Sequence, residues 1–177
     1  ELAGLPATAL ANARQAAQRA GLEGCLITLE FPSWYPVLAY CENAALREEV
    51  YRANVTRASD EGPHAGQWDN SAIIEETLAL RRELARLLGF ANYAELSLAT
   101  KMADSPAQVR AFLEQLSRQS RAQAQQEWRE LQAFAREEYG AQGINAWDVS
   151  FYSEKLRERR YQVSQEDIRP YLPVTRV

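Results

Sequence analysis

Residues 106–139 read PAQVRAFLEQLSRQSRAQAQQEWRELQAFAREEY, and this stretch holds no glycine and no proline after Pro106. Ser105, Pro106 and Gln108 form a helix-start signature, since serine accepts a first-turn N–H and proline suits the first helical position. At 1.5 Å per residue, the resulting helix would be about 51 Å long. A compact domain of 177 residues has a radius of gyration of only about 16 Å. We therefore expect a mainly all-α, elongated chain with one long helix near 106–139.

The expected long helix is apolar towards its two ends and polar between them. One apolar patch is made by Val109, Phe112, Leu113 and Leu116, and a second by Leu131, Phe134 and Tyr139. Residues 117–127 are all polar or alanine. This middle part is therefore expected to face water or another part of a larger protein.

Helix caps and apolar spacing predict seven further helices outside this stretch, about eight in all. They fall at 7–20, 33–41, 44–59, 70–88, 92–101, 148–160 and 164–170, with Asp148 and Ser164 as caps of the last two and Pro173 closing the pattern. In the 44–59 helix the expected apolar face holds Leu46, Val50 and Ala53, and the expected polar face holds Arg47, Glu48, Glu49 and Arg52.

Residues 25–31, CLITLEF, are the one segment with a strand pattern. Ile27 and Thr28 are β-branched, and apolar residues alternate through Leu29 to Phe31 before Pro32. A single strand leaves both edges unpaired, and no partner strand is evident in the chain. We expect one short strand here whose partner would have to come from elsewhere.

Composition and charge exclude several classes of function. The 177 residues are 46% apolar, with 20 basic and 24 acidic side chains and a formal net charge of −4, so a broad basic surface for nucleic acid is not expected. The longest apolar runs, such as 24–29 and 37–41, fall far short of the roughly 18 residues of a membrane span. The chain begins with Glu1 and shows no secretory signal pattern, so we expect a cytoplasmic segment without nucleic-acid or membrane partners.

Histidine and cysteine are too scarce for a metal centre or a catalytic triad. Cys25 and Cys41 are expected to be two buried thiols and not a disulfide, and His64 is the only histidine. A zinc site needs three or four His, Cys or carboxylate ligands at close spacing, which one loop histidine cannot supply. The eight glycines form no phosphate-binding loop. We therefore predict no catalytic residue and no metal ligand in this chain.

Four ordered segments carry a resemblance to a known family. They are LITLEFPSWYPVLAYCENAALREEVYRA, TRASDEGPHAGQWDNS, LLGFANYAELSLATKMA and INAWDVSFYSEKLRERRYQVSQEDIRPYLP. The resemblance as a whole runs in the same order from about Leu2 to Pro173. The most specific pieces are TRASD at 56–60, LGF at 88–90 and AWD at 146–148, followed by Tyr152 and Tyr161. In these pieces the chain resembles the thimet oligopeptidase-like zinc metallopeptidases.

The resemblance implies a mostly helical parent with two lobes facing across a deep channel that admits short peptides. Family members bind zinc through an H-E-x-x-H motif and a downstream glutamate, and the motif glutamate acts as general base on the zinc-bound water. That motif is absent from residues 1–177. The resemblance therefore implies zinc in the full-length parent and none on this segment, and it transfers no catalytic residue.

Two interpretations follow for residues 1–177. In the first, the chain is a helical segment of a larger two-lobed peptidase, supplies the channel wall, packs against the catalytic lobe of the same chain and is inactive alone. In the second, it is an independent helical module that binds a protein or peptide. An H-E-x-x-H motif in the reading frame after Val177 would support the first, and a stop codon the second. The isolated chain is also expected to self-associate through exposed apolar surface.

The candidate channel-wall residues are Arg57, Asp60, Tyr152 and Tyr161. Arg57 and Asp60 could bind the termini of a peptide, or form a local surface ion pair worth about 0–1 kcal/mol. The tyrosine hydroxyls could bond a peptide backbone, or the rings could fill the core beside a capping Asp148. The residues alone favour the structural role in both cases.

Overall fold

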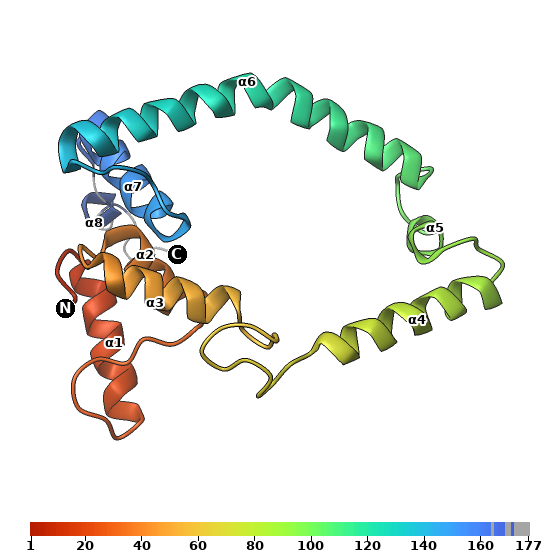
Figure 1. Cartoon of the computed structure of the whole chain (residues 1–177), viewed down its shortest axis with the longest axis horizontal. Helices are drawn as coiled ribbons and strands as arrows, with labels where there is room; N and C mark the ends of the chain where they lie inside the picture. The colour runs from red at the N-terminus through yellow and green to blue at the C-terminus, as the bar shows by residue number, and fades with distance from the viewer. Residues whose placement is uncertain (164, 169–170, 172–177) are drawn as a thin grey trace. The chain divides into compact units, whose positions relative to one another are not determined.

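The computed structural model describes residues 1–163, 165–168 and 171. Every regular element among them is helical, which confirms the predicted mainly all-α class. The chain divides into two units (Figure 1): unit 1 comprises Glu1–Val55 and Arg129–Val177, and unit 2 comprises Thr56–Trp128. The long helix α6, Pro106–Tyr139, has the predicted bounds and contributes its first part to unit 2 and its last part to unit 1.

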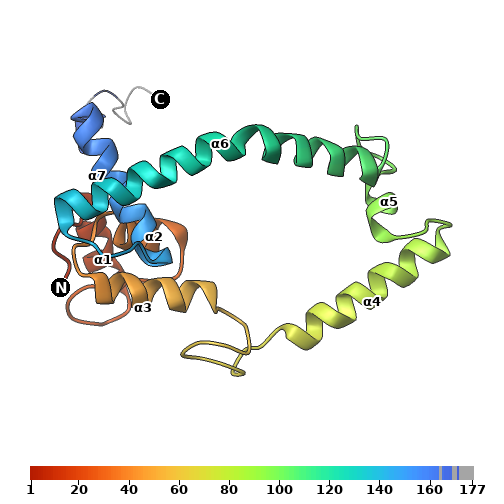
Figure 2. The same cartoon turned by 45° about the horizontal axis from the view of Figure 1, so that its top comes forward.

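Unit 1 is organised around α2. Its elements besides the end of α6 are α1 (Ala7–Arg19), α2 (Phe31–Tyr40), α3 (Ala44–Val55), the 3-10 helix η1 (Ala146–Asp148), α7 (Val149–Tyr161) and α8 (Gln165–Ile168). Helix α2 packs against α1, α3, η1 and α7, and the four α-helices lie together in both views of Figure 1 and Figure 2. The central cluster consists of Leu5, Val37, Leu38, Cys41 and Val50. Since apolar burial contributes about 25 cal/mol per Å², this cluster is the stabilising core of the unit.

Unit 2 consists of the loop 56–70, α4 (Ser71–Leu87), α5 (Tyr93–Leu98) and the first part of α6. Local caps define its helix starts. Asn92 Oδ1 accepts the Glu95 N–H at 3.0 Å, and Ser105 Oγ accepts the Gln108 N–H at 3.2 Å. Of the residues 56–128, all of which are described, only Ala85 is buried. Side chains thus cap α5 and α6, whereas the unit is almost without a core.

The predicted strand at 25–31 is wrong. Residues 25–28 have no regular structure, and Phe31 already belongs to α2. Neighbouring helices supply the hydrogen bonds that a ladder would have supplied: the Leu26 N–H donates to Ala13 O at 3.0 Å, and the Thr28 N–H donates to Ser33 Oγ at 2.8 Å. The alternation of apolar residues therefore reflects an extended connection between two helices, which β-propensity alone does not distinguish from a strand.

Several predicted helix ends differ from those observed. Helix α3 ends at Val55 instead of 59, because Ala58 takes a left-handed conformation with φ 55° and the chain enters the loop there. Helix α2 begins two residues earlier than predicted, and α5 ends at Leu98 instead of 101. The predicted cap Ser164, the end at 169–170 and the closing Pro173 lie outside the described residues.

Candidate functional site

The most elaborate polar arrangement in unit 1 is centred on Arg47 of α3. Asn43 Oδ1 accepts the N–H groups of Ala45 and Leu46 at 3.1 and 3.3 Å, which fixes the first turn of this helix. The Arg47 side chain is 3% exposed, and its Nη1 donates to Cys41 O at 2.6 Å. The amphipathic pattern predicted Arg47 on the solvent face, and this is wrong, because the guanidinium is turned into the core.

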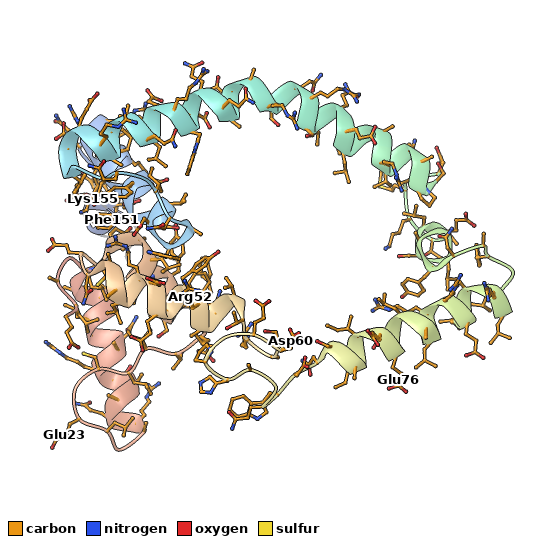
Figure 3. The ribbon with its side chains drawn as sticks, in the orientation of Figure 1. Glu23, Arg52, Asp60, Glu76, Phe151 and Lys155 are labelled. Carbon is orange, nitrogen blue, oxygen red and sulfur yellow. The ribbon has the colours of Figure 1, made fainter. Side chains whose placement is uncertain are left out.

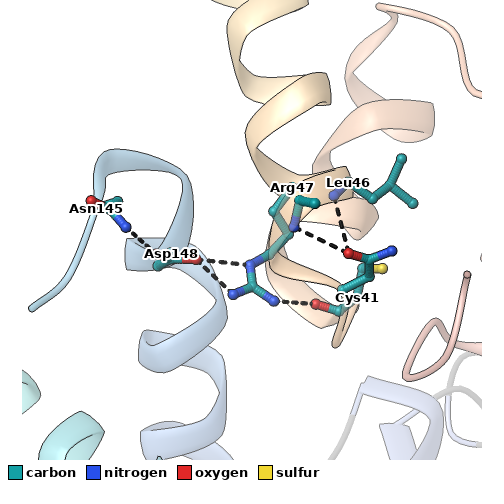
Figure 4. A network of polar contacts seen from close by, with 7 residues as sticks. Cys41, Leu46, Arg47, Asn145 and Asp148 are labelled. Atoms are coloured by element: carbon teal, nitrogen blue, oxygen red, sulfur yellow. Dashed lines mark hydrogen bonds and ion pairs between the residues drawn. The ribbon is translucent and has the colours of Figure 1, made fainter. Parts of the chain in front are cut away.

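Asp148, at the end of η1, is the partner of Arg47 (Figure 4). Arg47 Nε and Nη2 donate to Asp148 Oδ1 at 3.1 and 2.6 Å, and Asn145 Nδ2 donates to Asp148 Oδ2 at 3.1 Å. The predicted role of Asp148 as a side-chain cap of α7 is therefore wrong. Its carboxylate joins positions 101 residues apart in the sequence. Breaking a buried pair of this kind is strongly destabilising, because the remaining charge is left uncompensated.

Aromatic rings surround this ion pair. The Arg47 guanidinium carbon lies 4.2 Å from the centre of the Phe151 ring, and the Lys155 ammonium lies 5.8 Å from the same ring. Figure 3 labels Phe151 and Lys155 on α7. Tyr139 and Tyr152 pack edge-on against Phe151 with ring centres 5.9 and 5.4 Å away. The cluster excludes water from one side of the ion pair, which strengthens it electrostatically.

A second polar group links α2 and α7. Burial and the nearby Glu154 carboxylate raise the pKa of Tyr40 to about 12. Glu154 accepts a hydrogen bond from Arg157 Nε at 2.9 Å, and this bond holds the pKa of Glu154 below its usual value. Tyr40, Glu154 and Arg157 thus form one coupled set in which each charged group stabilises its neighbour.

The four predicted channel-wall residues occupy different settings. Arg57 and Asp60 are exposed in the loop 56–70 of unit 2 (Figure 3 labels Asp60). Tyr152 is partly buried in the aromatic cluster, where burial and the Asp148 charge raise its pKa. Tyr161 is 68% exposed in the last turn of α7. Tyr152 therefore packs against other rings, as its structural role predicted, whereas Tyr161 does not lie in the core.

The loop 56–70 is held by its own backbone. Ser59 Oγ donates to Thr56 O at 2.8 Å, and the Asn70 N–H donates to Ala58 O at 3.0 Å across the base of the loop. The ring of His64 lies 5.5 Å from that of Trp68, and both side chains are exposed. Gly62 has φ 85° and approaches Thr56 so closely that an added Cβ would lie 2.0 Å from its Oγ1. The loop is a compact surface feature and needs glycine at this position.

The described residues were compared with the ligand sets that zinc requires. Within the described part of the chain, no three His, Cys, Asp or Glu side chains gather in a way that could hold a metal ion. Both cysteines are free, but Cys25 is exposed and only Cys41 is buried, so the prediction of two buried thiols is wrong for Cys25. The ring of the sole histidine is tilted by 53° against that of Trp68 on the surface. The described helices also include none with the length and apolar character needed to cross a membrane. The arrangement in unit 1 joins α3 to η1 and can support structure.

Comparison of the sequence with known proteins identifies relatives of this chain. Residues 37–177 match the model of peptidase family M3. The chain belongs to that family. It is 55% identical over 173 residues to oligopeptidase A of Escherichia coli (strain K12), covering 98% of this chain and 25% of the relative. It is 53% identical over 177 residues to oligopeptidase A of Haemophilus influenzae, covering all of this chain and 26% of the relative.

More distant members of family M3 match the chain over the same extent. A probable cytosolic oligopeptidase A of Arabidopsis thaliana is 43% identical over 186 residues, covering all of this chain and 26% of the relative. The dipeptidyl carboxypeptidase of Escherichia coli (strain K12) is 30% identical over 178 residues. The chain thus spans about a quarter of the length of these relatives. The predicted family resemblance is confirmed.

Sequence reasoning missed the central residue of this M3 segment. Arg47 was placed with Glu48, Glu49 and Arg52 because all four are charged and helical spacing allows a common polar side. The one signal for a buried ion pair was Asp148 of the AWD piece, since a carboxylate that is buried requires either a cation or several hydrogen bonds. Nothing in a single sequence, however, pairs position 148 with position 47.

Proposed function

We propose that this chain is a scaffold segment of a zinc-dependent oligopeptidase of family M3. The complete enzyme would hydrolyse short peptides inside a deep channel, and this segment would supply helices to the channel wall and be inactive alone. The observation that carries the proposal is the 53–55% identity to oligopeptidase A along nearly the whole chain, in a segment without an H-E-x-x-H motif.

The side-chain inventory supports a scaffold role. Bound zinc supplies a Lewis acid and a water of lowered pKa, and that chemistry needs a group of ligands that is not found among the described residues. Unit 1 instead has a buried core in which the Arg47–Asp148 pair joins α3 to η1. Catalysis would then belong to another part of the protein, and this part would position helices around the substrate.

Peptide contact in the channel is proposed for the exposed candidates. Arg57 and Asp60 carry opposite charges on a loop, and charges of this kind can bind the carboxylate and ammonium termini of a short peptide. The hydroxyl of Tyr161 is exposed and can bond a peptide backbone. Tyr152 is the weakest of the four candidates, since neighbouring rings already cover part of it.

The cytoplasm is the proposed compartment. One relative is named as a probable cytosolic oligopeptidase A, while another, 42% identical over 186 residues, is named as organellar. Fractionation of cells expressing the complete protein would place it, and recovery in a membrane or secreted fraction would contradict the proposal.

A chimera gives the sharpest test of the function. The matching quarter of Escherichia coli oligopeptidase A would be replaced by this chain, and hydrolysis of a short fluorogenic peptide would be measured with and without a zinc chelator. We expect chelator-sensitive hydrolysis by the chimera and none by the isolated chain with added zinc. In the chimera, Arg57→Ala should raise KM with little change in kcat, whereas Arg82→Ala on the exposed side of α4 should change neither.

Two results would overturn the proposal. A folded, zinc-loaded chimera without peptide hydrolysis would mean that this chain cannot replace the scaffold, and would favour an independent interaction module. Zinc-dependent hydrolysis by the isolated chain would show that it contains its own catalytic residues. Circular dichroism and zinc analysis of each protein provide the controls for folding and loading.

A further inference from the structure

A line of large apolar side chains lies uncovered along α4. Ile73, Leu80, Leu84 and Leu87, which we call the α4 seam, are 59, 57, 46 and 77% exposed. Within unit 2, where every residue is described, α5 is the element that packs on α4, and it leaves Ala85 as the only buried residue. Ile74 and Leu78 of α4 are also 56 and 59% exposed, but they lie off this line. A continuous line of exposed apolar residues marks an interaction surface.

The spacing of the seam specifies the shape of what covers it. Together with Thr77, its residues follow one another at alternating steps of three and four positions, which is the a/d pattern of a helix packed along another helix. Thr77 fits such a position because its Oγ1 donates to Ile73 O at 2.7 Å and leaves no unsatisfied polar group. The partner is therefore a helix lying lengthwise on α4.

The charges beside the seam specify the polar edge of that partner. Glu76 and Glu83 lie seven positions apart on one side of the seam, and Figure 3 shows Glu76 extending from α4. On the other side, Arg81 already lies over the Tyr93 ring of α5 at 5.0 Å. Since charges in these flanking positions select the partner, the helix opposite Glu76 and Glu83 should carry lysine or arginine.

We infer that the α4 seam is covered, in the complete protein, by an amphipathic helix with a basic edge from the remaining part of the same polypeptide. The relatives are about four times as long as this chain, so they contain enough further sequence to supply the helix. This inference rests on the proposed function, because it takes the chain as one segment of a full-length oligopeptidase.

Thiol labelling tests the inference. Leu84→Cys, in a Cys25→Ser background, would be exposed to a thiol reagent in the isolated chain and in the full-length chimera, with the labelled site read by mass spectrometry. The isolated chain would be used at a concentration where light scattering shows a monomer. We expect labelling in the chimera to slow by at least about tenfold, since it then requires local opening. The matched control, Ala79→Cys, lies about 120° around α4 from the seam and should label quickly in both proteins.

Three outcomes would overturn the inference. Rapid labelling of Leu84→Cys in the folded chimera would mean that nothing covers the seam. Slow labelling in the monomeric isolated chain would mean that the chain covers the seam itself. Equally slow labelling of Ala79→Cys in the chimera would mean that the whole of α4 is enclosed and that the partner does not cover the seam specifically.

Hydroxyl-radical footprinting of the unmutated proteins provides a measurement that does not depend on whether Leu84→Cys folds. Oxidation of Leu80, Leu84 and Leu87 should fall in the chimera relative to the isolated chain, and unchanged oxidation would overturn the inference. The result is separate from that of the function test, because a chimera without peptide hydrolysis can still protect the seam.

Discussion

Arg47 is held by hydrogen bonds to Asp148 and Cys41 O at a site almost without solvent. The guanidinium has lost its hydration, so its stability depends on these acceptors and on the Phe151 ring beneath it. A substitution at this site therefore destabilises unit 1 chiefly because the partner of the replaced residue stays buried without its interaction.

Removing one member of the pair should destabilise unit 1 strongly. We expect Asp148→Asn or Arg47→Met to lower the free energy of unfolding by about 3–5 kcal/mol, since each leaves a buried group without its partner. The double variant should cost less than the sum of the single ones. Urea denaturation measures all three, with Arg118→Ala as the control, because Arg118 and Glu114 form an exposed pair at 3.9 Å. A single variant whose free energy of unfolding is as high as that of the control would contradict the role of the pair.

Tyr40 gives the stability of unit 1 a specific dependence on alkaline pH. Its pKa is about 12 in the folded chain against an ordinary 10.0, so the unfolded chain loses this proton first as pH rises. The contribution is complete below pH 10 and is lost between pH 10 and pH 12, amounting to about 2–3 kcal/mol. Tyr40→Phe should flatten this part of the stability curve in urea titrations from pH 9 to 12. An equally steep fall in that variant would assign the effect to other groups.

At the scale of elements, local signals in the sequence were sufficient for most helices. The bounds of α6 follow from Pro106, a proline-free and glycine-free run, and Gly140. The caps Asn43, Asn92 and Ser105 accept hydrogen bonds from N–H groups only two or three residues away, so local sequence is sufficient to indicate them. The strand at 25–31 failed for the opposite reason, since its hydrogen-bond partners lie in other helices and leave no local pattern.

The loop 56–70 allows a matched comparison of two glycines. Both Gly62 and Gly66 have positive φ, but only Gly62 abuts another side chain, that of Thr56. Gly66→Ala should cost about 1–3 kcal/mol of local backbone strain, and Gly62→Ala should cost more because of the added clash. Limited proteolysis within residues 56–70 should rise in the order wild type, Gly66→Ala, Gly62→Ala. Equal cleavage of the two variants would show that the contact with Thr56 is unimportant.

At the scale of the whole molecule, the two units differ in how much apolar surface they bury. Residues 37–41 of unit 1 are all buried, whereas unit 2 buries only Ala85 among its residues 56–128. The family and helical class could be predicted from sequence because they depend on many residues at once. The buried Arg47–Asp148 pair could not, because it depends on one contact across 101 positions.

Hydrogen exchange should reveal this difference in the isolated chain. We expect the amides of α2 to exchange slowly, through global unfolding of unit 1, and those of α4 to exchange quickly, through local opening. Mass spectrometry after brief labelling in deuterated buffer would measure both. Exchange of α4 as slow as that of α2 would mean that unit 2 has a stability of its own that its exposed side chains do not explain.

Exposed apolar surface should also make the isolated chain self-associate. The α4 seam, together with Phe112, Leu113 and Leu116 of α6, leaves large apolar side chains in contact with water. Light scattering over a concentration series should show the mean mass rising above 20.0 kDa, and Leu84→Glu should reduce that rise. A monomer at the highest concentration would contradict the prediction.

The separation of 101 residues between Arg47 and Asp148 also has a consequence during synthesis. At about 5–20 residues per second, the ribosome needs roughly 5–20 s after completing α3 before the aspartate is even made. Throughout that interval the Arg47 side chain of the nascent chain has no carboxylate to bind, and α7 is not yet available to pack on α2. Assembly of unit 1 is thus delayed until η1 and α7 have been synthesised, and a chaperone that shields α2 and α3 would be of most use before then.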